Sequence, residues 1–209
     1  MRALITLKDY ETVFRILYSV SASVGNTAGK ACLFYNVIGA RMLNEHLKVE
    51  ARPVVGSAFF LVHDQSNTVL SYSQIGADGP FSSPEAFHCW IECEGYVIDF
   101  TAPVFRESLS EVGQQLQIPR KMFQRPLSKM AKSWTELNSA GDFWLTPNVE
   151  LTAIALRRFL EKPAPSDLAN VCLHWFKKNS KTPESLSMIN DLGEITEMKL
   201  ANIRLSEAW

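Results

Sequence analysis

The sequence predicts one domain that combines helices with an antiparallel β-sheet, and three observations carry this prediction. Two segments with helical character come first, at about residues 6–20 and 29–47. Alternating apolar residues then predict strands, and a glycine-containing turn at residues 94–95 predicts an antiparallel hairpin. The length of 209 residues suits one sizeable core and is short for two. We therefore expect a single domain over residues 1–209.

The composition limits the classes of function that are expected for this protein. Hydrophobic residues make up 46% of the chain, charged residues 21%, and the net charge is -1, so no nucleic-acid partner is expected. Four cysteines without a disulfide framework favour a reducing compartment. The first apolar run is too short and too soon charged for a signal peptide, and no later run reaches membrane-spanning length. We expect a cytoplasmic protein without a membrane partner, and the oligomeric state stays open.

The second helical segment carries the first candidate for chemistry. A loop of small and polar residues, 21–29, leads into it, and Cys32 lies in its first turn. Unsatisfied backbone N–H groups and the helix dipole at this end favour a thiolate over a thiol. Position alone does not identify a nucleophile, because free cysteine is among the most buried residue types. A base and an orienting group must come from elsewhere in the chain.

Strand patterns follow the second helix. Residues 54–62 alternate in a way that suits a strand covered on both faces, and a second strand is expected at about 69–75. Turn-forming residues at 76–84 predict an exposed loop. Segments 87–93 and 96–101 then form the expected hairpin around its two-residue turn.

The length of that turn fixes which side chains share a face. With residues 94–95 as the turn, Trp90 lies opposite Asp99 and His88 lies opposite Thr101. His88 and Asp99 are then diagonal neighbours on one face, at roughly 7–8 Å between backbones, and their side chains can close this gap to a hydrogen bond. A slip of one residue would put them on opposite faces.

Beyond residue 103 the sequence predicts three helices, and residues 119–139 are mixed in character. Helices are expected at residues 110–118, 150–160 and 167–178, the last with Ser166 as its N-cap. The tail from 186 to 209 fits either a strand pair turning at 191–193 or a helix.

A thiol, a histidine and an aspartate in this arrangement follow the logic of a catalytic triad. Cys32 needs a base, His88 can serve as that base, and Asp99 can orient the imidazole and stabilise its cation. The oxyanion formed in acyl transfer needs donors, for which the backbone N–H of Cys32 and the side-chain amide of Asn26 are candidates. Trp90 is expected beside the site, where it packs on the sheet or contacts substrate and screens the His88–Asp99 pair from water.

Several sequence pieces together resemble the transglutaminase-like branch of the papain-like cysteine protease superfamily. These pieces are Gly-x-x-Cys opening an apolar helix that ends in residues 45–52, the strand Val54-Val55-Gly56, His88-Cys89-Trp90-Ile91-Glu92, and Val97-Ile98-Asp99-Phe100-Thr101-Ala102-Pro103. The resemblance covers about residues 20–105. It implies an α+β fold in which the cysteine-bearing helix packs on an antiparallel sheet, with additional C-terminal helices. Residues 106–209 would be an extension peculiar to a subfamily similar to bacterial proteins of unassigned function.

The resemblance also implies roles for the candidate residues. Cys32 would be the nucleophile, His88 the base and Asp99 the orienting group. The position after the cysteine, a tryptophan in most transglutaminases, is Leu33, which argues against protein crosslinking. We expect a hydrolase or transferase that acts on an amide, isopeptide or ester of a peptide, protein or small molecule through a thioester. This chemistry requires no metal or organic cofactor.

Two other interpretations stay open. In one, Cys32, His88 and Asp99 are structural residues of the core. In the other, the chain is a catalytically inactive transglutaminase-like module that binds a peptide or a partner protein. A metal site is disfavoured, because strand alternation places Cys89 and Cys93 on the face opposite His88.

Overall fold

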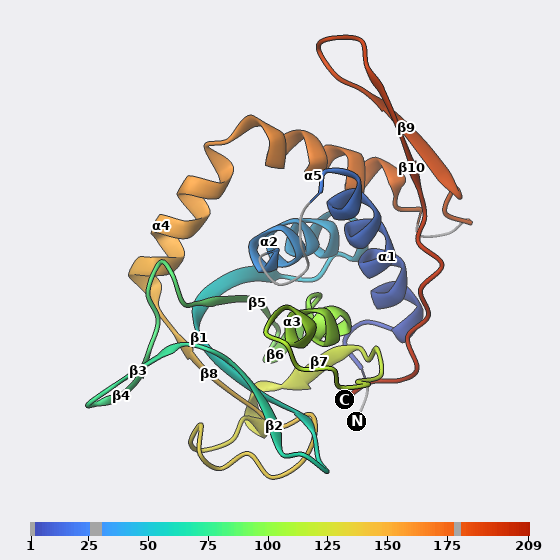
Figure 1. Ribbon diagram of the computed structural model, residues 1–209. Coiled ribbons are helices and arrows are strands. Elements are labelled where there is room, and N and C mark those ends of the chain that lie inside the picture. The colour runs from blue at the N-terminus through green and yellow to red at the C-terminus, as the bar shows by residue number, and fades with distance from the viewer. Residues whose placement is uncertain (1–2, 26–30, 178–180) are drawn as a thin grey trace.

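The computed structural model describes residues 3–25, 31–177 and 181–209, and it has an α+β architecture in which helices surround a curled antiparallel sheet (Figure 1). The predicted α+β class is confirmed. In the described segments, the main sheet has six strands in the order β2-β1-β5-β6-β7, with β8 paired to β1. The strands are β1 (Ala51–His63), β2 (Thr68–Tyr72), β5 (His88–Cys93), β6 (Tyr96–Asp99), β7 (Phe123–Pro126) and β8 (Phe143–Pro147).

Five α-helices and several short elements complete the described part of the chain. The α-helices are α1 (Leu7–Ser23), α2 (Cys32–Met42), α3 (Phe105–Glu111), α4 (Val149–Leu160) and α5 (Pro163–Trp175). A π-helical turn, η2 (Leu43–Leu47), continues α2, and single 3-10 turns are η3 (Ala102–Val104) and η4 (Leu127–Lys129). Two small hairpins pair β3 (Gln74–Gly76) with β4 (Gly79–Phe81) and β9 (Ser185–Ile189) with β10 (Ile195–Lys199).

The alternation along β5 and β6 divides the core between the two faces of the sheet. Ile91 and Ile98 belong to the cluster that holds α1, α2 and α5, whereas Trp90 and Val97 belong to a second cluster with α3. Helix α2 lies close on the sheet because residue 39 is glycine: a Cβ there would come within 2.5 Å of the Phe100 ring. This close contact sets the depth at which Cys32 meets the strand ends.

The predicted hairpin register is confirmed. Cys93 pairs with Tyr96, and Ile91 pairs with Ile98. The backbone φ angles of residues 94–95 are 49° and 80°, and two successive positive values are what a type I′ turn requires. The even turn length therefore leaves His88 and Asp99 on the same face.

The structure corrects two predictions in the second half of the chain. The helix predicted at 110–118 is wrong: α3 spans Phe105–Glu111, and Gly113, two residues further on, has a φ of 80° that does not continue a helix. Ser166 is not an N-cap, because α5 already begins at Pro163, and proline suits the first turn of a helix. Helix α4 confirms the prediction at 150–160.

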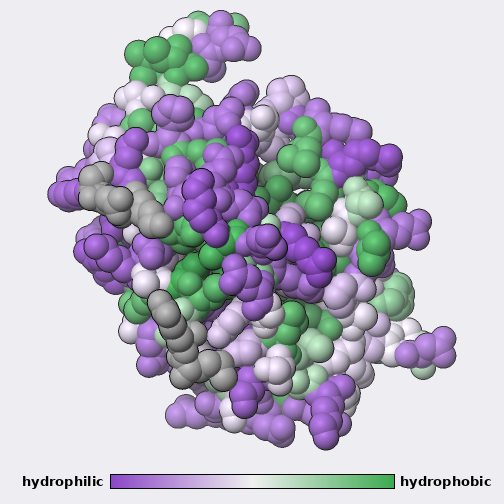
Figure 2. All heavy atoms as spheres, turned by 180° about the vertical axis from the view of Figure 1, so that it is seen from behind, coloured by the Kyte–Doolittle hydropathy of each residue, from purple (hydrophilic) through white to green (hydrophobic). Residues whose placement is uncertain are grey.

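The C-terminal half is closely joined to the rest of the fold. Strands β7 and β8 lie in the main sheet, although both come after residue 105. The tail forms the strand pair β9–β10. Of the two predicted alternatives for this segment, the strand pair is therefore confirmed and the helix is wrong. This hairpin projects from the body (Figure 1), and Figure 2 shows hydrophobic atoms gathered on the projecting part. The exposed apolar residues of the hairpin are Ile189, Leu192 and Ile195. None of the helices in the described segments is long and apolar enough to cross a membrane.

Candidate active site

The three candidate residues lie at the ends of three elements that meet. Cys32 is the first residue of α2 and is half-buried. Within the described residues no side chain caps that end of the helix, which leaves its first N–H groups as candidate donors. His88 begins β5 and Asp99 ends β6, and these side chains are 1% and 0% exposed.

His88 and Asp99 form a buried ion pair. Nε2 of His88 lies 2.7 Å from Oδ2 of Asp99. The other carboxylate oxygen, Oδ1, accepts hydrogen bonds from the Thr101 backbone N–H at 2.8 Å and from the Thr101 hydroxyl. The aspartate is therefore held by donors on both oxygens, as a buried charge needs to be.

Asn36 is a site residue that sequence reasoning missed. It lies one helical turn after Cys32 and is fully buried. Its side-chain Nδ2 donates to Oδ1 of Asp99 at 2.9 Å and to the Cys89 carbonyl at 2.7 Å, and its Oδ1 accepts from the Phe100 N–H at 2.9 Å. A lone amide four residues after the cysteine, inside an apolar helix, was the available signal.

The charges in the site favour an imidazolium facing a carboxylate. Burial lowers the pKa of His88, but the charge and hydrogen bond of Asp99, with a further contribution from Cys32, raise this pKa from 6.5 to about 10. Burial raises the pKa of Asp99, but His88 and the hydrogen bonds from Thr101 and Asn36 outweigh it, so the net shift is downward. At neutral pH both groups are charged.

The second ring nitrogen of His88, Nδ1, is buried and has no hydrogen-bond partner in the part of the chain that the structure describes. Hydrogen bonding and charge from Cys32 both contribute to raising the pKa of His88, although the sulfur and Nδ1 do not meet the geometry of a full hydrogen bond. The ring is held in place by Tyr72, stacked at 4.4 Å between centroids, and by Phe60, edge-on at 5.5 Å.

The two remaining candidate residues from the sequence are Trp90 and Asn26. Trp90 is 0% exposed and packs in the core cluster around α3, so it presents no surface to a substrate. Its place beside His88 in β5 still excludes water from that side of the sheet. Asn26 lies outside the described residues.

Other cysteines and charged groups do not form a competing centre. Cys89, Cys93 and Cys172 are buried, and burial raises the pKa of each thiol, for Cys93 to about 11. Among the residues described, no three His, Cys, Asp or Glu side chains cluster in a way that could hold a metal ion.

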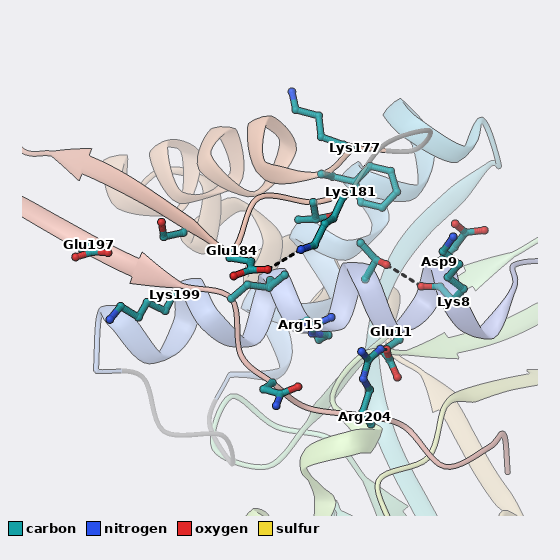
Figure 3. Close-up of a pocket in the computed structure, with 16 residues that line it drawn as sticks. Lys8, Asp9, Glu11, Arg15, Lys177, Lys181, Glu184, Glu197, Lys199 and Arg204 are labelled. Atoms are coloured by element: carbon teal, nitrogen blue, oxygen red, sulfur yellow. Dashed lines mark hydrogen bonds and ion pairs between the residues drawn. The ribbon is translucent and has the colours of Figure 1, made fainter.

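A groove of about 1360 Å³ lies between α1 and the β9–β10 segment, away from the candidate active site. Figure 3 shows both signs of charge on its walls, with Lys181 paired to Glu184 at 2.6 Å. Glu11 pairs in turn with Arg204 at 2.9 Å. None of Cys32, His88 and Asp99 lines it, and its charges partly neutralise one another.

Fold and site together define an α+β protein in which a cysteine at a helix start meets a buried histidine–aspartate pair. Residues 6–209 match the family described as "Protein of unknown function (DUF2026)", and the chain belongs to this family. It is similar to a protein solved as "The crystal structure of genomics APC5867", with 32% sequence identity and a TM-score of 0.86. That similarity covers 100% of this chain and 98% of the other. A comparison with curated proteins finds no match.

Proposed function

We propose that this protein is a cysteine-dependent acyl-transfer enzyme with a papain-like, transglutaminase-like core. The observation that carries the proposal is the state of His88. Its Nε2 is fixed by Asp99, its Nδ1 is left without a partner, and Cys32 approaches it from the start of α2. An imidazolium that is oriented through one nitrogen and has its other nitrogen available stabilises a thiolate nucleophile and can later donate a proton to the leaving group.

In the proposed reaction, Cys32 and His88 act one after the other. The Cys32 thiolate attacks the carbonyl carbon of an amide, isopeptide or ester, and a carbon–sulfur bond forms while the carbonyl oxygen becomes an oxyanion. The N–H groups at the start of α2 are placed to stabilise that oxyanion. Nδ1 of His88 donates its proton to the leaving amine or alkoxide as the carbon–heteroatom bond breaks. Water or an amine then attacks the thioester with His88 as the base, which returns the thiolate.

Asp99 does not exchange a proton in this scheme. Its hydrogen bond fixes the ring orientation of His88, and its charge stabilises the imidazolium. Asn36 and Thr101 hold the carboxylate in turn, and Asn36 does so from the helix that carries Cys32. Nucleophile and orienting group are thereby linked through a single buried amide.

Alkylation of Cys32 by iodoacetamide at pH 7 tests the proposal. We expect mass spectrometry of the native protein to find Cys32 labelled faster than glutathione by about tenfold or more. Cys89, Cys93 and Cys172 are buried and should stay unlabelled. His88→Ala should remove the acceleration.

A matched control is His63→Ala, because His63 lies at the end of β1 and, within the described residues, its ring forms hydrogen bonds only with Ser66. It should leave the labelling rate unchanged. Labelling of Cys32 at the rate of glutathione, with no effect of His88→Ala, would contradict the enzyme proposal. That result would instead favour an inactive module that binds a peptide or protein.

A further inference from the structure

A small apolar pocket lies directly beside the candidate active site. Its volume is about 160 Å³, comparable with cavities of about 150 Å³ that hold one benzene ring. Leu33 and Phe87 line it, and these are the chain neighbours of Cys32 and His88. Both side chains pack with Cys32 in the cluster that includes Leu151 and Ala155. The pocket therefore adjoins the nucleophile and the base through their chain neighbours, although Cys32 and His88 do not themselves line it.

One face of α4 forms the far wall. Residues 151, 154, 155, 158 and 159 line the pocket, and this spacing is that of a single helical face. The helix is fixed to the sheet at its start, where Thr152 and Asn148 bond the backbone of Val55. The α4 wall of the pocket is thus held against β1 by hydrogen bonds.

The lining of the pocket also includes two cations. Arg158 and Lys162 line the pocket and are exposed. In the part of the chain that the structure describes, no carboxylate forms an ion pair with either of them, although the adjacent Arg157 pairs with Glu161. An apolar pocket whose lining includes two cations without a carboxylate partner suits a chain or ring that carries an anionic group at one end.

We propose that this pocket binds the acyl part of the substrate, and that the preferred acyl group is a short apolar chain or ring ending in a carboxylate. This inference rests on the proposed function, since the acyl carbonyl must reach Cys32. The apolar stem would lie against Leu33, Phe87 and α4, and the carboxylate would meet Arg158 and Lys162.

Three p-nitrophenyl esters test the assignment: the acetate, the hexanoate and the monoester of adipic acid. The Cys32 thiolate forms a bond to the ester carbonyl carbon, and the bond to p-nitrophenolate breaks, so the leaving group departs with its electron pair and is measured by absorbance. Water then hydrolyses the thioester and releases the carboxylic acid. Rates are taken after subtraction of those of Cys32→Ser.

We expect kcat/KM for the hexanoate to exceed that for the acetate by about tenfold or more, because each buried methylene contributes about fourfold and burial of two of the four additional methylenes already gives about 16-fold. The adipate monoester should exceed the hexanoate by about fivefold, the upper range for an exposed ion pair. Arg158→Gln with Lys162→Gln should abolish the preference for adipate over hexanoate. Ile154→Trp, a change at a half-exposed position that fills the pocket, should lower the hexanoate-to-acetate ratio.

Arg157→Gln is the matched control, since it removes a charge from the same helix outside the pocket, and both ratios should be unchanged. Equal reactivity of the three esters at Cys32, or ratios that Ile154→Trp and the double variant do not alter, would overturn this inference and leave the proposed function standing. If none of the esters reacts faster than with Cys32→Ser, the proposed function and this inference both fall.

Discussion

Replacing Asn36 by leucine tests the link between the nucleophile helix and the orienting aspartate. Leucine has nearly the same shape, so packing is preserved while three hydrogen bonds are lost. Two of these join neutral groups and contribute about 1 kcal/mol each, and the bond to the Asp99 carboxylate contributes about 2 kcal/mol. The expected loss in the free energy of unfolding is therefore about 4 kcal/mol, measured by urea titration with tryptophan fluorescence.

The same variant should slow the labelling of Cys32 by iodoacetamide, because Asp99 loses one of the donors that fix it. Asn44→Leu is the matched control: this exposed amide of η2 also bonds the backbone, at 2.8 and 2.9 Å to Ala51, but water can replace it. It should cost about 1 kcal/mol or less and leave labelling unchanged. Equal stability losses in the two variants would refute the argument that the buried network holds the site together.

Three further variants follow from the geometry. Gly56→Ala should destabilise the fold by about 3 kcal/mol or more in urea titration, because a Cβ there would lie 2.0 Å from the Thr146 carbonyl oxygen; a loss below about 1 kcal/mol would contradict this packing. Cys32→Ser should change the free energy of unfolding by less than about 1 kcal/mol yet abolish acyl adducts in mass spectrometry, whereas a large loss would favour a structural thiol. Folding raises the pKa of His88 from 6.5 to about 10, so its contribution to stability is complete below pH 6.5 and is lost as pH rises toward 10. His88→Gln should remove that fall, and urea titrations that show the same decline in both proteins would refute the ion pair.

The hairpin was predictable because its information is local. A two-residue turn with glycine at its second position fixes the register, and alternation then assigns His88 and Asp99 to one face. The pairing of Cys93 with Tyr96 follows directly from that turn. By contrast, the sheet order and the entry of β7 and β8 depend on contacts between distant segments, which no local pattern encodes.

The residues of the candidate site also fall into two groups, those that local sequence patterns locate and those that only tertiary contacts reveal. Cys32, His88 and Asp99 were recognisable because each carries chemistry at a position that periodicity can locate. Asn36 was not, since one buried amide in an apolar helix has no distinctive pattern until its three partners are known. The wall formed by α4 was also hidden, because a helical stripe predicts burial and does not say against which element.

The polar groups around His88 favour a catalytic role over a structural one. A buried ion pair contributes little to stability compared with apolar side chains of the same volume, so its presence in the core needs another reason. A histidine retained only for structure would satisfy both ring nitrogens, because an unpaired buried polar group costs about 1–3 kcal/mol. Here Nε2 is bonded to Asp99 and Nδ1 is left without a partner beside a half-buried cysteine. An unsatisfied nitrogen at that place is the group that a thiol nucleophile would use.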